Sequence, residues 1–177
     1  MSGAAVEVAS PAAMEALGRR FGAALLGARP ATPGGVVVGL EGELGAGKTT
    51  FVQGLVEGVT GAAQRVTSPT FQLMNLYRPA ETVADGGARA AAEFRTLAHI
   101  DAYRLVGAQA FWELGIAELL EENVIIVVEW PSRTQHAIFE TEAVLLSFEH
   151  LFEVGKENVR RVRVERIPPG MRIDWPQ

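Results

Sequence analysis

The chain contains the stretch Gly42-Glu43-Leu44-Gly45-Ala46-Gly47-Lys48-Thr49-Thr50, which fits the P-loop pattern of Gly, four residues and Gly-Lys-Ser/Thr. Glycines let the backbone of such a loop wrap around phosphate groups, with successive N–H groups pointing inward. The helix that follows offers unpaired N–H groups and a partial positive charge at its N-terminus. In this pattern Lys48 reaches the β- and γ-phosphates, and the hydroxyl of Thr49 binds Mg²⁺. The stretch therefore predicts that residues 43–50 bind a nucleoside triphosphate with Mg²⁺.

The residues on either side of this stretch supply the structure that a P-loop requires. Residues 36–40, Val-Val-Val-Gly-Leu, form a short apolar run that is typical of a buried parallel strand. After the loop, apolar side chains recur at helical spacing, at Phe51, Val52, Leu55 and Val56. Strand, Gly-rich loop and helix thus follow one another in the required order. The alternative is a Gly-rich turn with a solvated lysine. The chain has only one lysine besides Lys48, so a lysine-rich composition does not explain a lysine at this position of the loop.

The composition is that of an ordinary globular protein. The chain has 177 residues, of which 48% are hydrophobic and 21% charged, and this predicts a single domain over residues 1–177. Its net charge of −5 gives no general attraction to nucleic acid, so an RNA contact would need a local patch or a partner protein. The absence of cysteine excludes disulfides and thiolate metal sites. Neither a signal peptide nor an apolar run of transmembrane length is found, and we expect a cytoplasmic protein without membrane contact.

Other helices and strands are predicted along the rest of the chain. Residues 1–9 are either a loose start or a first strand, and Ser10-Pro11 then begins a helix that Gly27 can end. Residues 107–122 are predicted to be helical, with a break at Gly115. Strands are predicted at residues 71–77, 97–101, 124–130, 143–148 and 159–164. We therefore expect an α/β, P-loop NTPase-like fold, with a mixed, mostly parallel sheet flanked by helices and an antiparallel C-terminal strand pair.

Two acidic residues end predicted strands, Asp101 and Glu129. In a parallel sheet, ligands bind at the edge formed by the carboxyl ends of the strands. Glu129 follows the most apolar strand, as does the acid that holds Mg²⁺ in other P-loop proteins, and Glu129 and Thr49 are therefore candidate metal ligands. The alternative for Glu129 is a helix cap or a surface ion pair. Asp101 is suited either to orienting water or to holding the outer shell of the metal.

The nucleotide is predicted to be ATP. Common GTPases recognise guanine with an Asn/Thr-Lys-x-Asp segment. The only lysine outside the P-loop is Lys156, and it stands in Gly-Lys-Glu-Asn, which does not fit that segment.

Three further segments leave their role open. The hydroxyl groups on either side of Pro69 either reach a γ-phosphate or its Mg²⁺, or make local bonds in a turn. Arg161 and Arg163 share one face of a predicted strand, which could meet RNA or a partner, although a solvated edge strand is the commoner explanation. Residues 79–93 have no clear periodicity, and we interpret them as a surface loop or a hairpin tip.

Taken together, these residues resemble the bacterial TsaE (YjeE) family of ATPases. The P-loop alone is common, whereas the His-x-Asp-x-Tyr-Arg and Val-Glu-Trp-Pro segments make the combination specific. The matching segments lie in family order between residues 42 and 131: the P-loop, Ser68-Pro69-Thr70-Phe71, His99-Ile100-Asp101-Ala102-Tyr103-Arg104-Leu105, Glu113-Leu114-Gly115-Ile116 and Val128-Glu129-Trp130-Pro131.

The resemblance implies an ATPase that is slow alone and uses ATP and Mg²⁺. It implies TsaD and TsaB as partners, which transfer the threonylcarbamoyl group to the adenosine at position 37 of ANN-decoding tRNAs, so that tRNA is met only through the complex. Carried over by motif, Lys48 binds phosphate, Thr49 and Glu129 bind Mg²⁺, Asp101 serves hydrolysis, and Trp130 lies beside the nucleotide.

The chain departs from the family pattern in two places. Many relatives have Thr four residues before the Gly of the first helix, where this chain has Met14. A backbone contact to the nucleotide would survive there, but a hydroxyl contact would not. The segment 79–93 also looks longer than the usual link.

Two other functions are compatible with the P-loop. A small-molecule kinase would close a lid over the phosphates, for which Arg78, Arg89 and Arg95 are candidates. Its ATP consumption would depend on a phosphate acceptor. A nucleotide-gated binding module would bind ATP without meaningful turnover, and Glu129→Ala would then change partner affinity but not product formation.

Overall fold

The computed structural model describes residues 4–27, 34–79, 96–122, 124–135, 137–151, 158–173 and 175. Its strands form one sheet in the order β1-β7-β6-β2-β5-β4-β3. The strands span β1 (Ala5–Val8), β2 (Val36–Gly42), β3 (Met74–Tyr77), β4 (Leu97–Asp101), β5 (Ile125–Glu129), β6 (Ala143–His150) and β7 (Arg160–Arg166). The four central strands, β6, β2, β5 and β4, are parallel, and β3, β7 and β1 pair antiparallel to their neighbours. This confirms the predicted mixed sheet and its antiparallel C-terminal pair.

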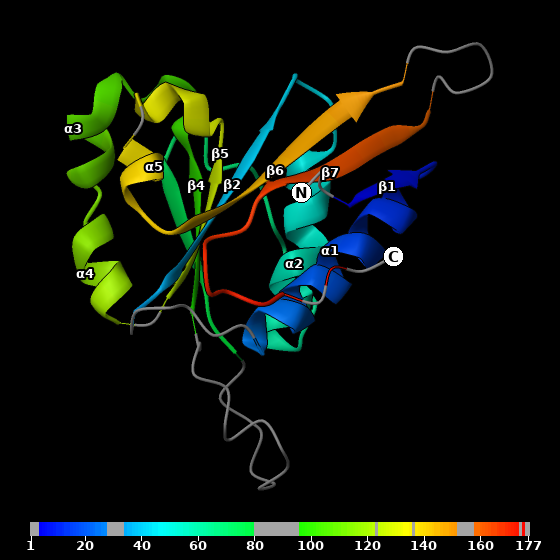
Figure 1. Ribbon diagram of the computed structural model, residues 1–177, viewed down its shortest axis with the longest axis horizontal. Helices are drawn as coiled ribbons and strands as arrows, with labels where there is room; N and C mark the ends of the chain where they lie inside the picture. Colours follow the sequence, from blue (N-terminus) through cyan, green and yellow to red (C-terminus); the bar gives the residue numbers. More distant parts are fainter. Residues whose placement is uncertain are drawn as a thin grey trace, which may run out of the picture.

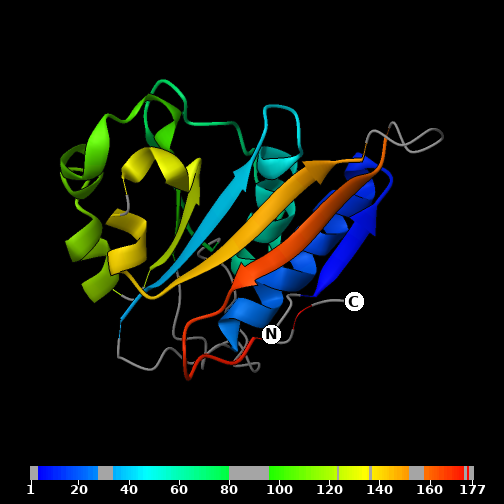
Figure 2. The ribbon, with the colours of Figure 1, turned by 45° about the horizontal axis from the view of Figure 1, so that its top comes forward.

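Helices cover both faces of the sheet, as Figures 1 and 2 show. One face carries α1 (Pro11–Leu26) and α2 (Lys48–Thr60), and the other carries α3 (Gly107–Trp112), α4 (Ile116–Glu121) and α5 (Ala137–Glu140). Ser10 caps α1 by accepting a hydrogen bond from the backbone N–H of Ala13, and Gly27 ends it, as predicted. Gly115 separates α3 from α4 with a left-handed φ of 79°, which confirms the expected break.

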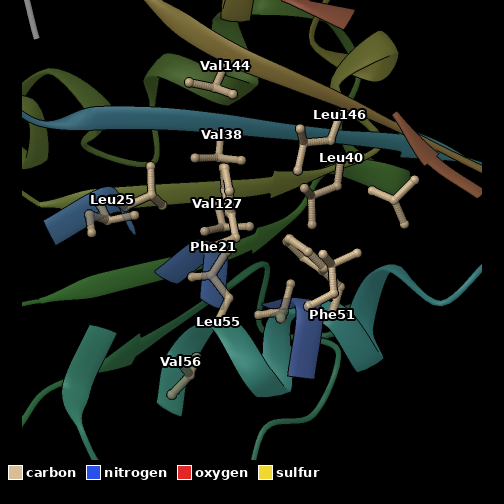
Figure 3. Close-up of a cluster of buried hydrophobic side chains, with 14 of the residues drawn as sticks. Phe21, Leu25, Val38, Leu40, Phe51, Leu55, Val56, Val127, Val144 and Leu146 are labelled. Atoms are coloured by element: carbon tan, nitrogen blue, oxygen red, sulfur yellow. The ribbon is translucent and has the colours of Figure 1, made fainter. Parts of the chain in front are cut away.

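Alternation along the strands divides the core into two layers. Val38, Leu40 and Val127 point toward α1 and α2, where they pack with Phe21 and Phe51 in the larger layer (Figure 3). The intervening side chains pack against the short helices on the other face, among them Val37, Ile126 and Val128. Every one of these side chains is at most 1% exposed. The central strands are therefore buried on both faces, which is why their sequences are apolar runs rather than alternating patterns.

Close contact between α1 and α2 fixes the helix that follows the P-loop. Gly18 and Gly54 lie where the two backbones meet. A Cβ atom at Gly54 would be 1.8 Å from the carbonyl oxygen of Glu15, and one at Gly18 would be 2.1 Å from that of Phe51. Only a residue without a side chain fits at either position, so the backbones of α1 and α2 touch directly where the two helices cross.

The predicted strand over residues 71–77 was wrong in its first half. Pairing with β4 begins only at Met74. Before it, the chain is still in the turn that Pro69 begins: the backbone N–H of Leu73 donates to the carbonyl of Pro69 at 2.6 Å, and Leu73 has a φ of 65°. A left-handed residue cannot continue a strand, so the apolar side chains before Met74 mimic a strand without forming one.

The edge-strand interpretation of Arg161 and Arg163 was also wrong. β7 lies between β1 and β6, and β1 forms the edge. Arg161 bonds across to Glu7 of β1 at 2.7 Å and lies 3.9 Å from Glu149 of β6. The acids on both neighbouring strands explain a positive charge at this position of a paired strand.

The remaining sequence expectations for loops fall largely outside the described residues. This holds for residues 80–93 of the predicted surface loop, for Arg89 and Arg95 of the suggested lid, and for Lys156. Within the part of the chain that is described, no helix is both long enough and apolar enough to cross a membrane.

Substituting Gly54 tests the contact between α1 and α2. Gly54→Ala should lower the free energy of unfolding by about 1–3 kcal/mol, because the added Cβ would overlap the backbone of α1. Chemical denaturation measures this change. Gly27→Ala is the matched control, since its Cβ would be 3.6 Å from the nearest atom and its φ of −94° suits alanine. Equal stability of the Gly54→Ala and Gly27→Ala proteins would contradict the packing described here.

Candidate nucleotide site

The P-loop connects β2 to α2 and has the conformation that its glycines permit. Gly45 and Gly47 have φ angles of 77° and 97°, in the left-handed region that other residues rarely adopt. The backbone N–H of Phe51 donates to the carbonyl of Gly47 at 2.9 Å, which closes the first turn of α2 directly on the loop. Without a side chain on Gly47, the N-terminus of the helix is open to an anion.

Lys48 is a buried cation held by neutral partners. Lys48 is only 4% exposed, and its Nζ donates to the carbonyl oxygens of Gly42 at 2.6 Å and Glu43 at 2.9 Å. The same atom lies 3.8 Å from the centre of the Trp130 ring. Burial lowers the pKa of Lys48, and the negative charges of Glu129, Glu41 and Asp101 oppose that shift.

Strand register brings the two predicted acids to one edge of the sheet. Asp101 on β4 is directly opposite Glu129 on β5, which in turn is opposite Leu40 on β2. Glu129 is only 3% exposed, and its Oε1 accepts a hydrogen bond from the hydroxyl of Thr49 at 2.9 Å. The alternative of a helix cap or a surface ion pair for Glu129 does not hold in this geometry.

Hydroxyl groups surround the second acid. The Oδ2 of Asp101 accepts from Ser68 at 2.7 Å and from Thr70 at 2.6 Å, and its Oδ1 accepts from the backbone N–H of Tyr103 at 3.0 Å. Burial opposes ionisation of Asp101, but these hydrogen bonds outweigh it, so the pKa of Asp101 lies below its ordinary value. Asp101 is therefore an ionised hydrogen-bond acceptor at neutral pH.

Two cavities flank the P-loop and share Gly45. The first has a volume of about 420 Å³, and its lining joins the predicted acids to the loop: Leu44, Gly45, Lys48, Thr49, Ser68, Thr70, Asp101, Tyr103, Glu129 and Trp130. The second, of about 350 Å³, lies on the other side of the loop and is lined by Ala9, Ser10, Pro11, Met14, Gly45, Gly47, Thr50, Asn158 and Arg160. We call them the acidic cavity and the α1 cavity.

Most of the site residues predicted from the sequence thus line one of the two cavities. Ala46 does not, since it is 1% exposed and packs in the core. Glu43 contributes its carbonyl to Lys48. Sequence reasoning did not assign a role to His99 and left open the hydroxyls around Pro69. These hydroxyls donate to Asp101, which the sequence had already identified as a candidate residue. Only the fold shows that the segment around Pro69 lies next to Asp101.

Comparison with known proteins identifies the family. The family model described as "Threonylcarbamoyl adenosine biosynthesis protein TsaE" matches residues 8–160. The chain belongs to the TsaE family. Among curated proteins named tRNA threonylcarbamoyladenosine biosynthesis protein TsaE, that of Treponema pallidum is 37% identical over 99 residues, which are 56% of this chain and 62% of the relative. That of Streptomyces coelicolor is 41% identical over 117 residues, or 66% of each chain.

The chain spans less than two thirds of the length of these two relatives. A solved structure, that of YdiB from Bacillus subtilis, covers more of the chain at lower identity. It superimposes with a TM-score of 0.60 and 22% identity, over 98% of this chain and 88% of YdiB. This likeness confirms the P-loop NTPase-like fold.

The oxygen donors of this TsaE-family chain fit Mg²⁺ bound together with a nucleotide. The described residues contain no group of three or more His, Cys, Asp or Glu side chains that could hold a metal alone. Thr49 and Glu129 instead offer a hydroxyl and a carboxylate at the mouth of the P-loop. Mg²⁺ is typically bound in this way, by one or two protein oxygens together with phosphates and waters.

Apolar side chains stand exposed around the acidic cavity. Leu44 and Phe71 are 87% and 85% exposed, and Arg104 lies over the ring of Phe71 with 4.5 Å between its Cζ and the ring centre. Tyr103 packs against Trp130 with 5.3 Å between ring centres. In this TsaE-family chain the mouth of the site thus carries side chains suited to contact with another protein.

The low pKa of Asp101 predicts how stability depends on pH. Because the folded pKa is below the unfolded value of 3.8, the contribution of this carboxylate is full above that pH and is lost as pH falls through the folded pKa. Asp101→Asn should therefore be less stable than the parent at pH 7, and the difference should shrink below about pH 4. Urea unfolding from pH 7 to pH 3 measures it.

Glu122→Gln, at an exposed residue, is the control for this pH series. It should change the free energy of unfolding by less than about 0.5 kcal/mol. A stability gap between Asp101→Asn and the parent that is the same at pH 7 and pH 3 would show that the carboxylate charge does not matter.

Proposed function

We propose that this chain is a Mg²⁺-dependent ATPase, slow alone, that serves the threonylcarbamoyladenosine modification at position 37 of ANN-decoding tRNAs together with TsaD and TsaB. The observation that carries the proposal is the convergence of Lys48, Thr49, Asp101 and Glu129 on one cavity beside the P-loop. Family membership supplies the link to tRNA modification. The expected compartment is the cytoplasm.

The two cavities suggest how ATP would lie across the loop. The phosphates would occupy the P-loop and extend into the acidic cavity, where Lys48 lies. The nucleoside would then occupy the α1 cavity. Met14 lies there, 3.0 Å from where a Cβ of Gly47 would be, and it offers the base an apolar surface in place of a hydroxyl. Contacts that select adenine would come from backbone atoms or from the polar residues of this cavity, which are Ser10, Thr50, Asn158 and Arg160.

Bound Mg²⁺ would neutralise phosphate charge, with Thr49 and Glu129 as its protein contacts. The hydroxyl of Thr49 can donate its proton to Glu129, as it does here, and still offer a lone pair to the metal. Lys48 would exchange its two carbonyl acceptors for phosphate oxygens, which are stronger partners for a cation.

Asp101 is better suited to orienting water than to removing a proton from it. A general base works best when its pKa is near the working pH, whereas the pKa of Asp101 is below the ordinary value. Ser68 and Thr70 hold the same carboxylate oxygen and line the cavity beside it. Such an arrangement positions groups around a γ-phosphate but supplies little proton transfer, which agrees with the slow turnover proposed for the chain alone.

The exposed rim supports a protein partner at the site. Exposed Leu44 lines the acidic cavity together with the catalytic candidates, and exposed Phe71 directly follows Thr70, which also lines it. A partner that covers them would exclude water from the site and strengthen its electrostatic contacts. This is also the observation that favours the second candidate function, a nucleotide-gated binding module in which ATP controls partner affinity without meaningful turnover.

Phosphate release from ATP tests the proposal, first with the chain alone and then with its cognate TsaD and TsaB. We expect slow phosphate release that rises when the TsaD–TsaB pair is added. Lys48→Ala should release none, because its free energy of ATP binding should be weaker by about 1.5–3 kcal/mol or more. A rate that does not respond to the pair would contradict the accessory role. Unchanged ATP affinity in Lys48→Ala would contradict the P-loop assignment, and ATP-dependent partner binding without turnover would select the binding module.

Asp101→Ala separates binding from hydrolysis. The variant should bind ATP with about the affinity of the parent, because Asp101 is held by hydroxyls rather than by the P-loop. Its turnover should fall by about 10²-fold or more, as expected when a group that positions a reactant is removed. Equilibrium nucleotide binding and single-turnover hydrolysis measure the two quantities. Hydrolysis at the parent rate would make Asp101 a structural residue.

A further inference from the structure

His99 is a buried polar residue whose side chain makes a single hydrogen bond among the described residues. It lies on β4, two residues before Asp101 and so on the same face of the strand. The residue is 0% exposed, and its Nε2 is 2.9 Å from the Oε1 of Glu129. Its other ring nitrogen, Nδ1, is buried and has no hydrogen-bond partner among the described residues. His99 does not line the acidic cavity.

The direction of this hydrogen bond follows from its acceptor. In the metal-binding role proposed for Glu129 its carboxylate can only accept, so Nε2 of His99 would be the donor of this hydrogen bond. Thr49 donates to the same atom, Oε1, at the same distance of 2.9 Å. Two donors on one oxygen fix the rotation of the carboxylate. The Oε2 atom is thereby left for the acidic cavity, which Glu129 lines.

Packing alone does not account for a histidine at this position. The neighbouring inward positions of the sheet, such as Leu97 and Val127, carry apolar side chains that fill the same layer without a polar atom. An imidazole there leaves Nδ1 unpaired, which destabilises a fold. The hydrogen bond to Glu129 is a contact that an apolar residue could not provide.

We infer that His99 is a positioning residue for Mg²⁺ binding, and this inference depends on the proposed function. His99 holds Oε1 of Glu129 so that Oε2 faces the metal or a water bound to it. Thr49 donates to the same oxygen, but its hydroxyl is free to turn about its own side-chain bond. The donor nitrogen of His99 is part of a ring that is buried within the sheet on β4. Outer partners of this kind typically change metal affinity by about 10- to 100-fold.

Mg²⁺ titration of nucleotide binding tests the inference without relying on activity. The full chain is mixed with a fluorescent, non-hydrolysable ATP analogue, first in EDTA and then with increasing Mg²⁺. His99→Leu should raise the Mg²⁺ midpoint by about 10-fold or more. Its affinity for the analogue in EDTA should match that of the parent, because Lys48 and the loop are unchanged. His99→Gln should keep a midpoint near that of the parent, since its amide nitrogen reaches about as far as Nε2.

Two further variants keep the test decisive. Ile100→Val alters the neighbouring core residue on the opposite face of β4, and it should lower the thermal midpoint of unfolding without moving the Mg²⁺ midpoint. If His99→Leu does not fold, His99→Asn takes its place. The asparagine side chain is too short for its amide to reach Glu129, so this variant should have a higher Mg²⁺ midpoint than His99→Gln.

Several outcomes would overturn the inference. An unchanged Mg²⁺ midpoint in His99→Leu, or in His99→Asn where that replaces it, would do so. Equal shifts of the Mg²⁺ midpoint in His99→Gln and His99→Leu, or in Ile100→Val and His99→Leu, would assign the shift to packing rather than to the hydrogen-bond donor at residue 99. Failure of the parent to bind the analogue under any condition would instead reject the proposed function, and the role of His99 with it.

Discussion

Parallel pairing of β2, β5 and β4 is the constraint on which the rest of the site depends. The register places Leu40, Glu129 and Asp101 level with one another, so that three strands end at one edge of the sheet. Backbone hydrogen bonds in the interior set this register, and the buried runs on both faces prevent it from slipping. The carboxylates therefore meet the P-loop because backbone pairing holds β4 and β5 in register with β2.

The position of α2 is fixed by α1 as well as by the sheet. Its N-terminus carries Lys48 and Thr49, and its far side is held against α1 by glycines at the contact. A helix held by backbone contact has little freedom to shift along its neighbour, because no side chain can change rotamer to accommodate the movement. The 2.9 Å contact between the hydroxyl of Thr49 and the carboxylate of Glu129 therefore depends both on the packing of α2 and on the register of the sheet.

Sequence was sufficient for the parts of the site that depend on local pattern. The P-loop, its strand and its helix follow from glycine spacing and apolar runs, and the acids at the ends of β4 and β5 follow from the rule for parallel sheets. Contacts between segments that are distant in the sequence were harder to predict. The strand expected at residues 71–77 begins only at Met74, because Leu73 is left-handed and nothing local reveals it. Arg161 was assigned to an edge strand because β1, the strand that pairs with β7 and forms the edge, is too short to give a clear sequence pattern. The role of His99 required the register between β4 and β5.

Among the described residues, Lys48 and Asp101 each make their hydrogen bonds with neutral groups and not with one another. Lys48 is held by carbonyls and the Trp130 ring, Asp101 by hydroxyls and a backbone N–H, and neither carboxylate forms an ion pair with Lys48 among the described residues. Breaking a buried ion pair typically costs about 3–5 kcal/mol. A bound triphosphate would face no such cost, since it would exchange one set of hydrogen bonds for stronger, charge-assisted ones. The separation of charges in the free protein thus prepares the site for an anionic ligand that brings its own cation.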